Sequence, residues 1–294
     1  MTKQTILKKN YEELDFTDDF MFCKVLQNNE NLCKELIELI TGKKISRISF
    51  PEKQKTIEMT ADNKGIRLDI YVEDDEYSVY DVEMQMTRKT NLPKRSRYYQ
   101  GLIDLNLIER GEDYRKLRKS YIIFIMMDDF FDKGLHLYTF SNLCKQMPEL
   151  ALNDEAEKIF LCANGIADDV SEDMKEFLDF LKERSTKNKF TKELADAVDQ
   201  VRRNEDWRLE YMTRYVRDMD IREEGVEMGL EIGLNKGDSL RLISLIQKKI
   251  QKSKSLETIA DELEETPNSI RSIYDLIRQH PDKSAEEILE CMED

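Results

Sequence analysis

Two strand-like runs on either side of a short acidic turn, within residues 66–85, constrain the fold of this chain more than any other stretch. Both runs are rich in β-branched and aromatic side chains, which is typical of an antiparallel β-hairpin. Side chains alternate between the two faces of a strand, so one face of the second strand carries three polar groups: Asp81, Glu83 and Gln85. If the turn centres near Asp75, Asp69 on the first strand lies opposite Asp81 and diagonal to Glu83.

The acidic face of this hairpin needs a compensating charge, because neighbouring carboxylates repel one another. A divalent cation with oxygen ligands is a natural compensator, whereas a solvated polar face on an edge hairpin is the simpler alternative. The following sequence favours the cation, since residues 84–103 contain no acidic side chain although the whole chain has 61 acidic and 46 basic ones. The same stretch holds five basic residues: Arg88, Lys89, Lys94, Arg95 and Arg97. An acidic metal site followed by a basic rim suits hydrolysis of a phosphodiester bond.

Three motifs in this order resemble those of a known nuclease family. Asp69 followed by the segment 83–85 resembles the D…(D/E)xK signature of the PD-(D/E)XK nuclease superfamily, with Gln85 at the position of the lysine. Residues 19–24 are similar to an N-terminal Asp-x-x-Phe-Lys block with one extra residue before the lysine, and residues 95–99 to a basic helix that ends in tyrosines. Over about residues 10–165 the chain therefore resembles the recombination-promoting nuclease (Rpn) family, also described as PD-(D/E)XK nuclease family transposases.

The resemblance implies a specific set of site residues. Asp69 and Glu83 would bind Mg²⁺, with Mn²⁺ as the alternative ion, and the backbone carbonyl of Met84 would add a ligand. Gln85 is neutral, so it would orient the attacking water rather than supply positive charge. The catalytic set is then Asp69, Glu83 and Gln85.

Further residues are expected around that set. Asp19 and Asp81 would lie beside the ligands; the alternatives are a plain charge at a helix N-terminus for Asp19 and a solvated side chain for Asp81. The expected nucleic-acid contacts, with DNA as the partner, are Arg88, Lys89, Lys94, Arg95, Arg97 and Tyr98.

The pattern of strands and helices up to residue 165 predicts an α/β domain. Apolar periodicity predicts helices over 12–27, 30–41 and 91–110, and strands over 45–50, 55–60, 121–127, 135–140 and 158–163. The run 121–127 is almost continuously apolar, which is typical of a central strand covered on both faces. We therefore expect residues 1–165 to form a restriction-endonuclease-like core in which helices flank a mixed central sheet.

The rest of the chain carries no strand pattern and predicts an all-α C-terminal region. Residues 166–238 form a helical region, with helices over 170–182, 191–203 and 205–234. The last of these contains glycines at every fourth position: Gly225, Gly229, Gly233 and Gly237. Because each glycine costs a helix about 1 kcal/mol, we expect a closely packed partner, such as a second copy of the chain in a homo-oligomer. The alternatives are a repeat-expanded connector and an intramolecular partner such as the helix near 171–183. Residues 239–294 resemble a small helix-turn-helix tail, with a plain helical hairpin as the alternative.

Composition excludes several other classes of protein. The five cysteines form no CxxC pair, which argues against a zinc knuckle, and the two histidines are far apart, which argues against a Ser-His or Cys-His hydrolase. No P-loop motif occurs, so nothing supports a P-loop protein. No apolar run approaches 18 residues and no signal-peptide pattern opens the chain, so we expect a cytoplasmic protein without membrane spans. The net charge of −15 disfavours general coating of nucleic acid but leaves room for a local basic rim.

These features together predict a Mg²⁺-dependent DNA endonuclease linked to recombination, mobile elements or phage defence. The alternative is a non-catalytic protein with a nuclease fold, which would act in protein interaction or DNA binding through its helical tail.

Overall fold

The computed structural model describes residues 9–51, 56–57 and 66–293. The chain divides into two compact units, Met1–Tyr211 and Met212–Asp294. The first unit contains a mixed six-stranded sheet and the second is entirely helical in its described part, as the sequence predicts for an α/β core followed by helices. None of the described helices is both long enough and apolar enough to span a bilayer.

The central sheet has the strand order β1-β4-β5-β6-β8-β7. Its strands are β1 (Ile48–Ser49), β4 (Ile70–Asp74), β5 (Val79–Gln85), β6 (Ser120–Met126), β7 (Leu137–Phe140) and β8 (Ala156–Cys162). The three middle strands β5, β6 and β8 run parallel, and the outer strands pair antiparallel to their neighbours. A separate pair joins β2 (Thr56–Ile57) to β3 (Ile66–Arg67). The rest of the strand predicted over 55–60 lies outside the described residues.

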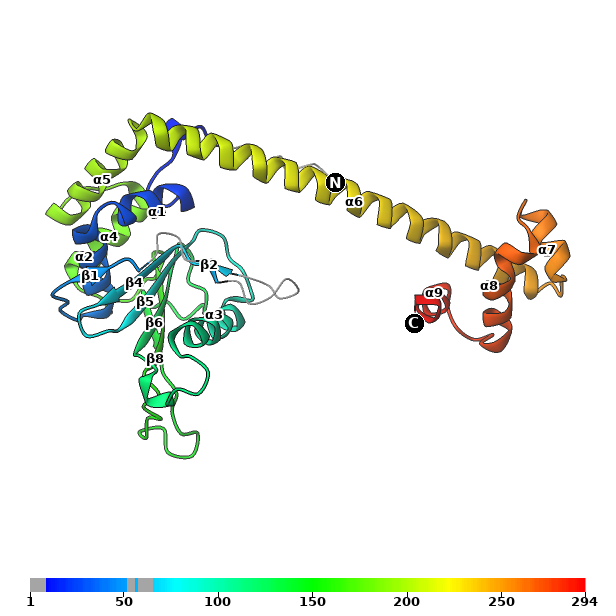
Figure 1. Cartoon of the computed structure of the whole chain (residues 1–294), viewed down its shortest axis with the longest axis horizontal. Helices are drawn as coiled ribbons and strands as arrows, with labels where there is room; N and C mark the ends of the chain where they lie inside the picture. Colours follow the sequence, from blue (N-terminus) through cyan, green and yellow to red (C-terminus); the bar gives the residue numbers. More distant parts are fainter. Residues whose placement is uncertain (1–8, 52–55, 58–65, 294) are drawn as a thin grey trace. The chain divides into compact units, whose positions relative to one another are not determined.

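Helices cover both faces of this sheet (Figure 1). One face packs against α1 (Asp19–Gln27), α2 (Glu30–Thr41), α4 (Glu172–Glu183) and α5 (Lys189–Arg202), and the other packs against α3 (Leu92–Leu107). Two 3₁₀ turns, Tyr11–Glu13 and Tyr114–Lys116, complete the unit. Every residue of β6 is buried, so the prediction of a central, doubly covered strand is confirmed.

Two helices show how local sequence sets their bounds. The helix predicted over 30–41 is confirmed as α2, which ends where Gly42 adopts a left-handed backbone with φ 68°. The helix predicted over 12–27 begins only at Asp19. The Asp15 carboxylate accepts the N–H of Thr17 at 3.0 Å, and Asp18 accepts the N–H of Asp15 at 2.8 Å. These side chains compete with the helical hydrogen bonds of the backbone, so a turn replaces the first part of the predicted helix.

The predicted hairpin exists, but its register differs from the expected one. Its first strand is interrupted after Arg67, and Ile70 pairs with Val82 while Tyr71 pairs with Asp81. This pairing centres the turn on residue 76. The Asp74 carboxylate stabilises the turn by accepting the N–H groups of residues 76 and 78 at 2.9 and 2.7 Å. The expectation that Asp69 faces Asp81 is wrong: the observed pairing, continued by one residue, places Asp69 beside Glu83.

The helices after residue 165 belong to both units. Helices α4 and α5 contribute to the same apolar core as α1 and α2, so the first unit extends well beyond the strand region. Helix α6 (Glu205–Ile250) has 46 residues and continues past residue 234, where the sequence pattern suggested its end. In the second unit, the end of α6 packs with α7 (Leu256–Glu262), α8 (Pro267–Gln279) and α9 (Ala285–Glu293) around one small core.

Candidate active site

The three polar side chains of β5 lie on the sheet face that α3 covers. They alternate with Tyr80 and Val82, which point into the core on the opposite face. Because β5 is an interior strand, Asp81, Glu83 and Gln85 are all buried. The alternative of a solvated edge hairpin is therefore wrong.

Two hydrogen bonds link Asp69, which lies just before β4, to the end of β5. The Asp69 N–H donates to Oε1 of Glu83 at 3.1 Å, and the Met84 N–H donates to Oδ2 of Asp69 at 3.2 Å. Helix α1 fixes the bend at Asp69 from the other side, since Gln27 Nε2 donates to the Asp69 carbonyl at 3.2 Å. These hydrogen bonds place the carboxyl group of Asp69, just before β4, close to that of Glu83 on β5. That both bind a metal ion stays a prediction.

Burial and mutual repulsion raise the pKa values of these acids. Burial, followed by the charges of Glu83 and Asp19, raises the pKa of Asp69 to about 9. The pKa of Asp81 is raised well above its ordinary value, first by burial and then by Glu83 and Asp69. Burial also raises the pKa of Glu83, although the Arg95 charge acts in the opposite direction. The site carries more negative charge than its surroundings neutralise.

Asp81 is the most deeply enclosed of these acids. It is fully buried, and neither of its carboxylate oxygens accepts a hydrogen bond from any donor that the structure describes. The charges of Glu83 and Asp69 add to burial in favouring the protonated form of Asp81 and so raise its pKa. Asp81 lies two residues before the predicted ligand Glu83 on the same strand face, and its role beside the ligand set stays a prediction.

Arg95 reaches into this site from α3. Its guanidinium donates through Nη2 to Glu83 Oε2, through Nη1 to Gln85 Oε1 at 2.8 Å and through Nε to the Tyr99 hydroxyl at 2.6 Å. Arg95 was expected among the residues that bind phosphate, but here it lies within the acidic cluster. Tyr99 was not predicted as a site residue; its position four residues after Arg95 on α3 was the available signal.

The side chain of Gln85 has both ends engaged. Its Oε1 accepts from Arg95, and its Nε2 donates to the carbonyl and the hydroxyl of Thr87 at 2.9 and 3.2 Å. Gln85 therefore has a fixed orientation at the carboxyl end of β5, two residues beyond Glu83 on the same strand face.

The other five predicted nucleic-acid contacts lie outside the acidic cluster. Arg88 forms an ion pair with Asp132 at 2.6 Å. Lys89, Lys94 and Arg97 are exposed and form no ion pair with any residue in the described ranges. Tyr98 is 40% exposed on α3. Lys89, Lys94 and Arg97 therefore provide positive charge at the surface, after β5 and on α3.

A second group of ligand types lies next to Asp69. One oxygen of Asp19, Sγ of Cys23 and one oxygen of Asp69 all lie within 4.8 Å of one another. Asp19 thus lies beside the predicted ligand Asp69, as expected, whereas Cys23 was not predicted. The signal for Cys23 was its position one helical turn after Asp19. The carboxylate oxygens of Asp19 and Asp69 are ligands of the type that a hard divalent cation prefers. Glu83 does not belong to this group of three.

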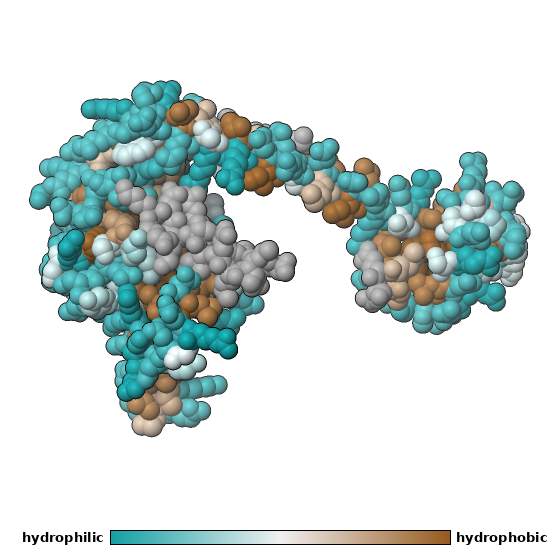
Figure 2. Space-filling view, in the orientation of Figure 1, coloured by the Kyte–Doolittle hydropathy of each residue, from teal (hydrophilic) through white to brown (hydrophobic). Residues whose placement is uncertain are grey.

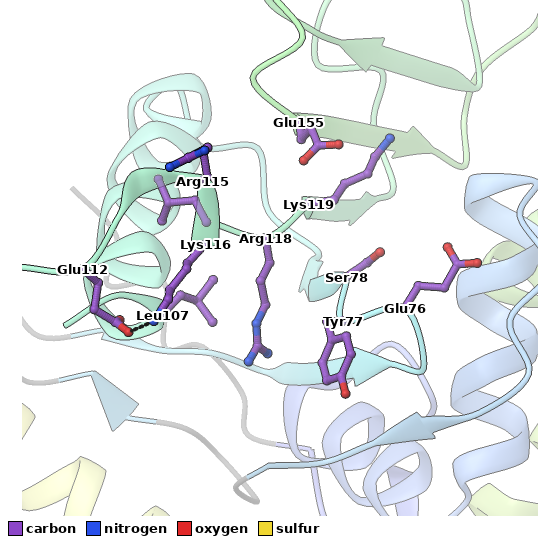
Figure 3. A pocket seen from close by; sticks show the side chains of 11 residues that line it. Glu76, Tyr77, Ser78, Leu107, Glu112, Arg115, Lys116, Arg118, Lys119 and Glu155 are labelled. Atoms are coloured by element: carbon purple, nitrogen blue, oxygen red, sulfur yellow. Dashed lines mark hydrogen bonds and ion pairs between the residues drawn. The ribbon is translucent and has the colours of Figure 1, made fainter.

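A separate pocket of about 670 Å³ lies at the opposite end of β5 (Figure 3). It is lined by Tyr77 and Ser78, which precede β5, and by a basic run before β6. Arg118 in this run lies 5.4 Å from the ring centroid of Tyr77 and pairs with Glu73, and the other bases of the run also pair with acids. Its charge is therefore largely neutralised, and it is not part of the acidic site.

Comparison with known proteins agrees with the resemblance seen in the sequence. The family model described as "PD-(D/E)XK nuclease family transposase" matches residues 14–225. This range includes the six-stranded sheet, all helices that flank it and the first part of α6. No curated protein and no solved structure matches the chain.

Proposed function

The chain belongs to the PD-(D/E)XK nuclease family transposases, and from this premise we propose that it is a Mg²⁺-dependent endonuclease that hydrolyses DNA. Family membership supports a nuclease that binds DNA and uses a divalent ion. The observation that carries this proposal is the mutual placement of Asp69 and Glu83 in a buried cluster of three carboxyl groups that contains a single guanidinium, that of Arg95.

Asp69 and Glu83 are the residues that we propose to hold the ion, with the carbonyl of Met84 as a further ligand and Mn²⁺ as an alternative ion. When bound, the ion supplies activation of a water and neutralisation of charge on the phosphate. Asp19 and Asp81 lie beside the ligands and add negative charge that favours a cation.

The remaining residues bind and orient. Gln85 would accept a hydrogen bond from the attacking water through the second lone pair of its Oε1, because its amide nitrogen already donates to Thr87. The basic side chains of the rim, Arg88, Lys89, Lys94 and Arg97, would bind the phosphates of DNA, and the neutral Tyr98 would add a further contact to DNA. Because such contacts release counterions from DNA, the affinity for DNA should fall steeply as the salt concentration rises.

Incubation of the purified protein with plasmid DNA and Mg²⁺ tests this proposal. Asp69→Ala and Glu83→Ala should each abolish cleavage, because loss of one carboxylate from so small a ligand set removes most of the ion affinity. Glu76→Ala, which removes an exposed acid from the β4–β5 turn, is the matched control and should cut normally. If both site variants cut as well as the wild type, the assignment of the site is wrong.

We also propose that the chain forms a homo-oligomer through its C-terminal helical region. The middle of α6 exposes apolar side chains along the helix, including Val226, Leu230 and Leu234 at 57%, 63% and 68% exposure (Figure 2). Two copies would place two nuclease sites on one duplex, one for each strand. Light scattering of the full-length chain tests this, and Leu230→Glu should shift it toward the monomer.

The non-catalytic alternative rests on the second unit. Helices α7 and α8 pack through buried Ile259, Ile270 and Ile273, as a helix-turn-helix does. The exposed face of α8, however, has only two basic side chains that could contact DNA, Arg271 and Arg278, and the acidic Asp275 lies between them. DNA binding that survives Asp69→Ala but is lost on Arg271→Ala would favour this alternative. The setting that we propose for the enzyme is the cytoplasm, in recombination of mobile DNA or in defence against phage.

A further inference from the structure

Arg95 is the cation that pairs with the acidic cluster of the candidate site, through Glu83. Its three donor nitrogens bond to Glu83, Gln85 and Tyr99, and its guanidinium carbon lies 4.9 Å from the centroid of the Tyr99 ring. Among the residues that the structure describes, no other cation forms an ion pair with Asp69, Asp81 or Glu83. One guanidinium therefore faces three carboxyl groups.

Both oxygens of Glu83 are already engaged in this arrangement. Oε1 accepts from the backbone of Asp69, and Oε2 accepts from Arg95. A divalent ion bound at Asp69 and Glu83 would lie close to the Arg95 guanidinium, which is paired with Glu83. Two positive charges that share one carboxylate repel each other strongly in a poorly solvated site. The ion and Arg95 therefore compete for the negative charge of Glu83.

We propose that Arg95 is a positioning residue that holds Glu83 and Gln85 in place before the ion arrives, and that ion binding displaces it from Glu83. This inference rests on the proposed function, because it takes Glu83 as an ion ligand. The guanidinium and the ion are alternative partners for one carboxylate, so each weakens the binding of the other.

Displacement of Arg95 requires little disruption of the fold. Its side chain is 24% exposed, whereas that of Glu83 is 2% exposed, so the guanidinium can turn toward solvent while the carboxylate stays in place. The released group would join the exposed bases of the rim on α3, Lys94 and Arg97. An arginine at that position can bind a phosphate through two parallel hydrogen bonds.

The test is a comparison of Arg95→Met with the matched control Arg97→Met, an exposed arginine on the same helix without an ion pair in the described part of the chain. Thermal unfolding is followed for each full-length variant in EDTA and in millimolar Mn²⁺, and Mn²⁺ affinity is measured by calorimetry. Arg95→Met should unfold about 5–10 °C below the wild type in EDTA, because Glu83 loses its partner. In Mn²⁺ this gap should shrink by at least about half, and the affinity for Mn²⁺ should rise about fivefold or more, because the ion replaces the lost charge.

Two further results separate the possible failures. If wild type binds Mn²⁺ but the gap in unfolding temperature is the same with and without the ion, Arg95 is a structural residue and the inference is wrong, while the proposed function stands. If wild type binds no divalent ion, the proposed function and this inference both fail. Arg95→Lys keeps the charge but not the forked geometry, so it should show the same pattern with a smaller gap; it serves as the decisive variant if Arg95→Met does not fold.

Discussion

Replacing Asp69 by asparagine should stabilise the ion-free protein, although it should destroy the proposed ion site. Burial and the charges of Glu83 and Asp19 raise the pKa of Asp69 to about 9, so the folded state keeps a proton that the unfolded state releases. A group with a raised pKa contributes its full stability below the unfolded value of 3.8 and loses it as pH rises toward about 9. The ion-free wild type should therefore become less stable between about pH 5 and pH 9.

The magnitude follows from the same shift. Holding the carboxyl protonated at about pH 8 costs up to about 6 kcal/mol, at 1.4 kcal/mol for each pH unit above the unfolded pKa. Asp69 keeps partial exposure, and Glu83 and Asp81 remain in the same poorly neutralised cluster. We therefore expect Asp69→Asn to raise the free energy of unfolding of the ion-free protein by about 2–3 kcal/mol. Because Asn has nearly the shape of Asp, it can still accept the N–H of Met84.

The single tryptophan provides the assay. Trp207 packs against the core of the first unit, so its fluorescence reports the unfolding of that unit alone. In EDTA at about pH 8, Asp69→Asn should unfold about 4–12 °C above the wild type, and this difference should vanish near pH 4. Addition of Mn²⁺ should stabilise the wild type but not the variant.

The control is Glu76→Gln, which removes an exposed acid on the same hairpin and should leave the pH dependence unchanged. The reasoning is refuted if Asp69→Asn is less stable than the wild type in EDTA, or if the two proteins lose stability equally as the pH rises. Either result would mean that the buried carboxylates are not strained in the absence of the ion.

Three further predictions concern other parts of the chain. Gln85→Ala should lower the rate of DNA cleavage by about 10²–10⁴-fold while leaving Mn²⁺ binding by calorimetry nearly unchanged; lost ion binding would contradict its role in orienting water. Gly229→Ala with Gly233→Ala should raise helix content by circular dichroism, because an added Cβ at either position meets no described atom within 4 Å and alanine is favoured by about 1 kcal/mol per site. If light scattering shows that the same double variant also loses self-association, the glycines form the proposed contact; unchanged assembly would place it elsewhere on α6. Thr266→Ala should destabilise the second unit by about 1 kcal/mol in urea unfolding, since its side chain caps α8 at the Ser269 N–H, and no change would mean that the cap is dispensable.

The sequence by itself determined the main elements of this protein. Apolar periodicity located α2 and α3, the near-continuous apolar run located β6, and alternation placed Glu83 and Gln85 on one strand face. The motifs around Asp69 and Glu83 were sufficient to identify the family. These features are local, because each depends on residues within a few positions of one another.

Only the tertiary structure decided how those elements form a site. The Asp74 side chain stabilises a turn centred on residue 76, and the register of that hairpin places Asp69 beside Glu83. The position of β5 between β4 and β6 buries the acidic face. Burial in turn made one cation necessary, and the packing of α3 on that face supplied Arg95, which the sequence suggested as a surface contact. Side-chain pairing across strands and helices depends on register and packing, and the pattern of a single segment does not contain either of these.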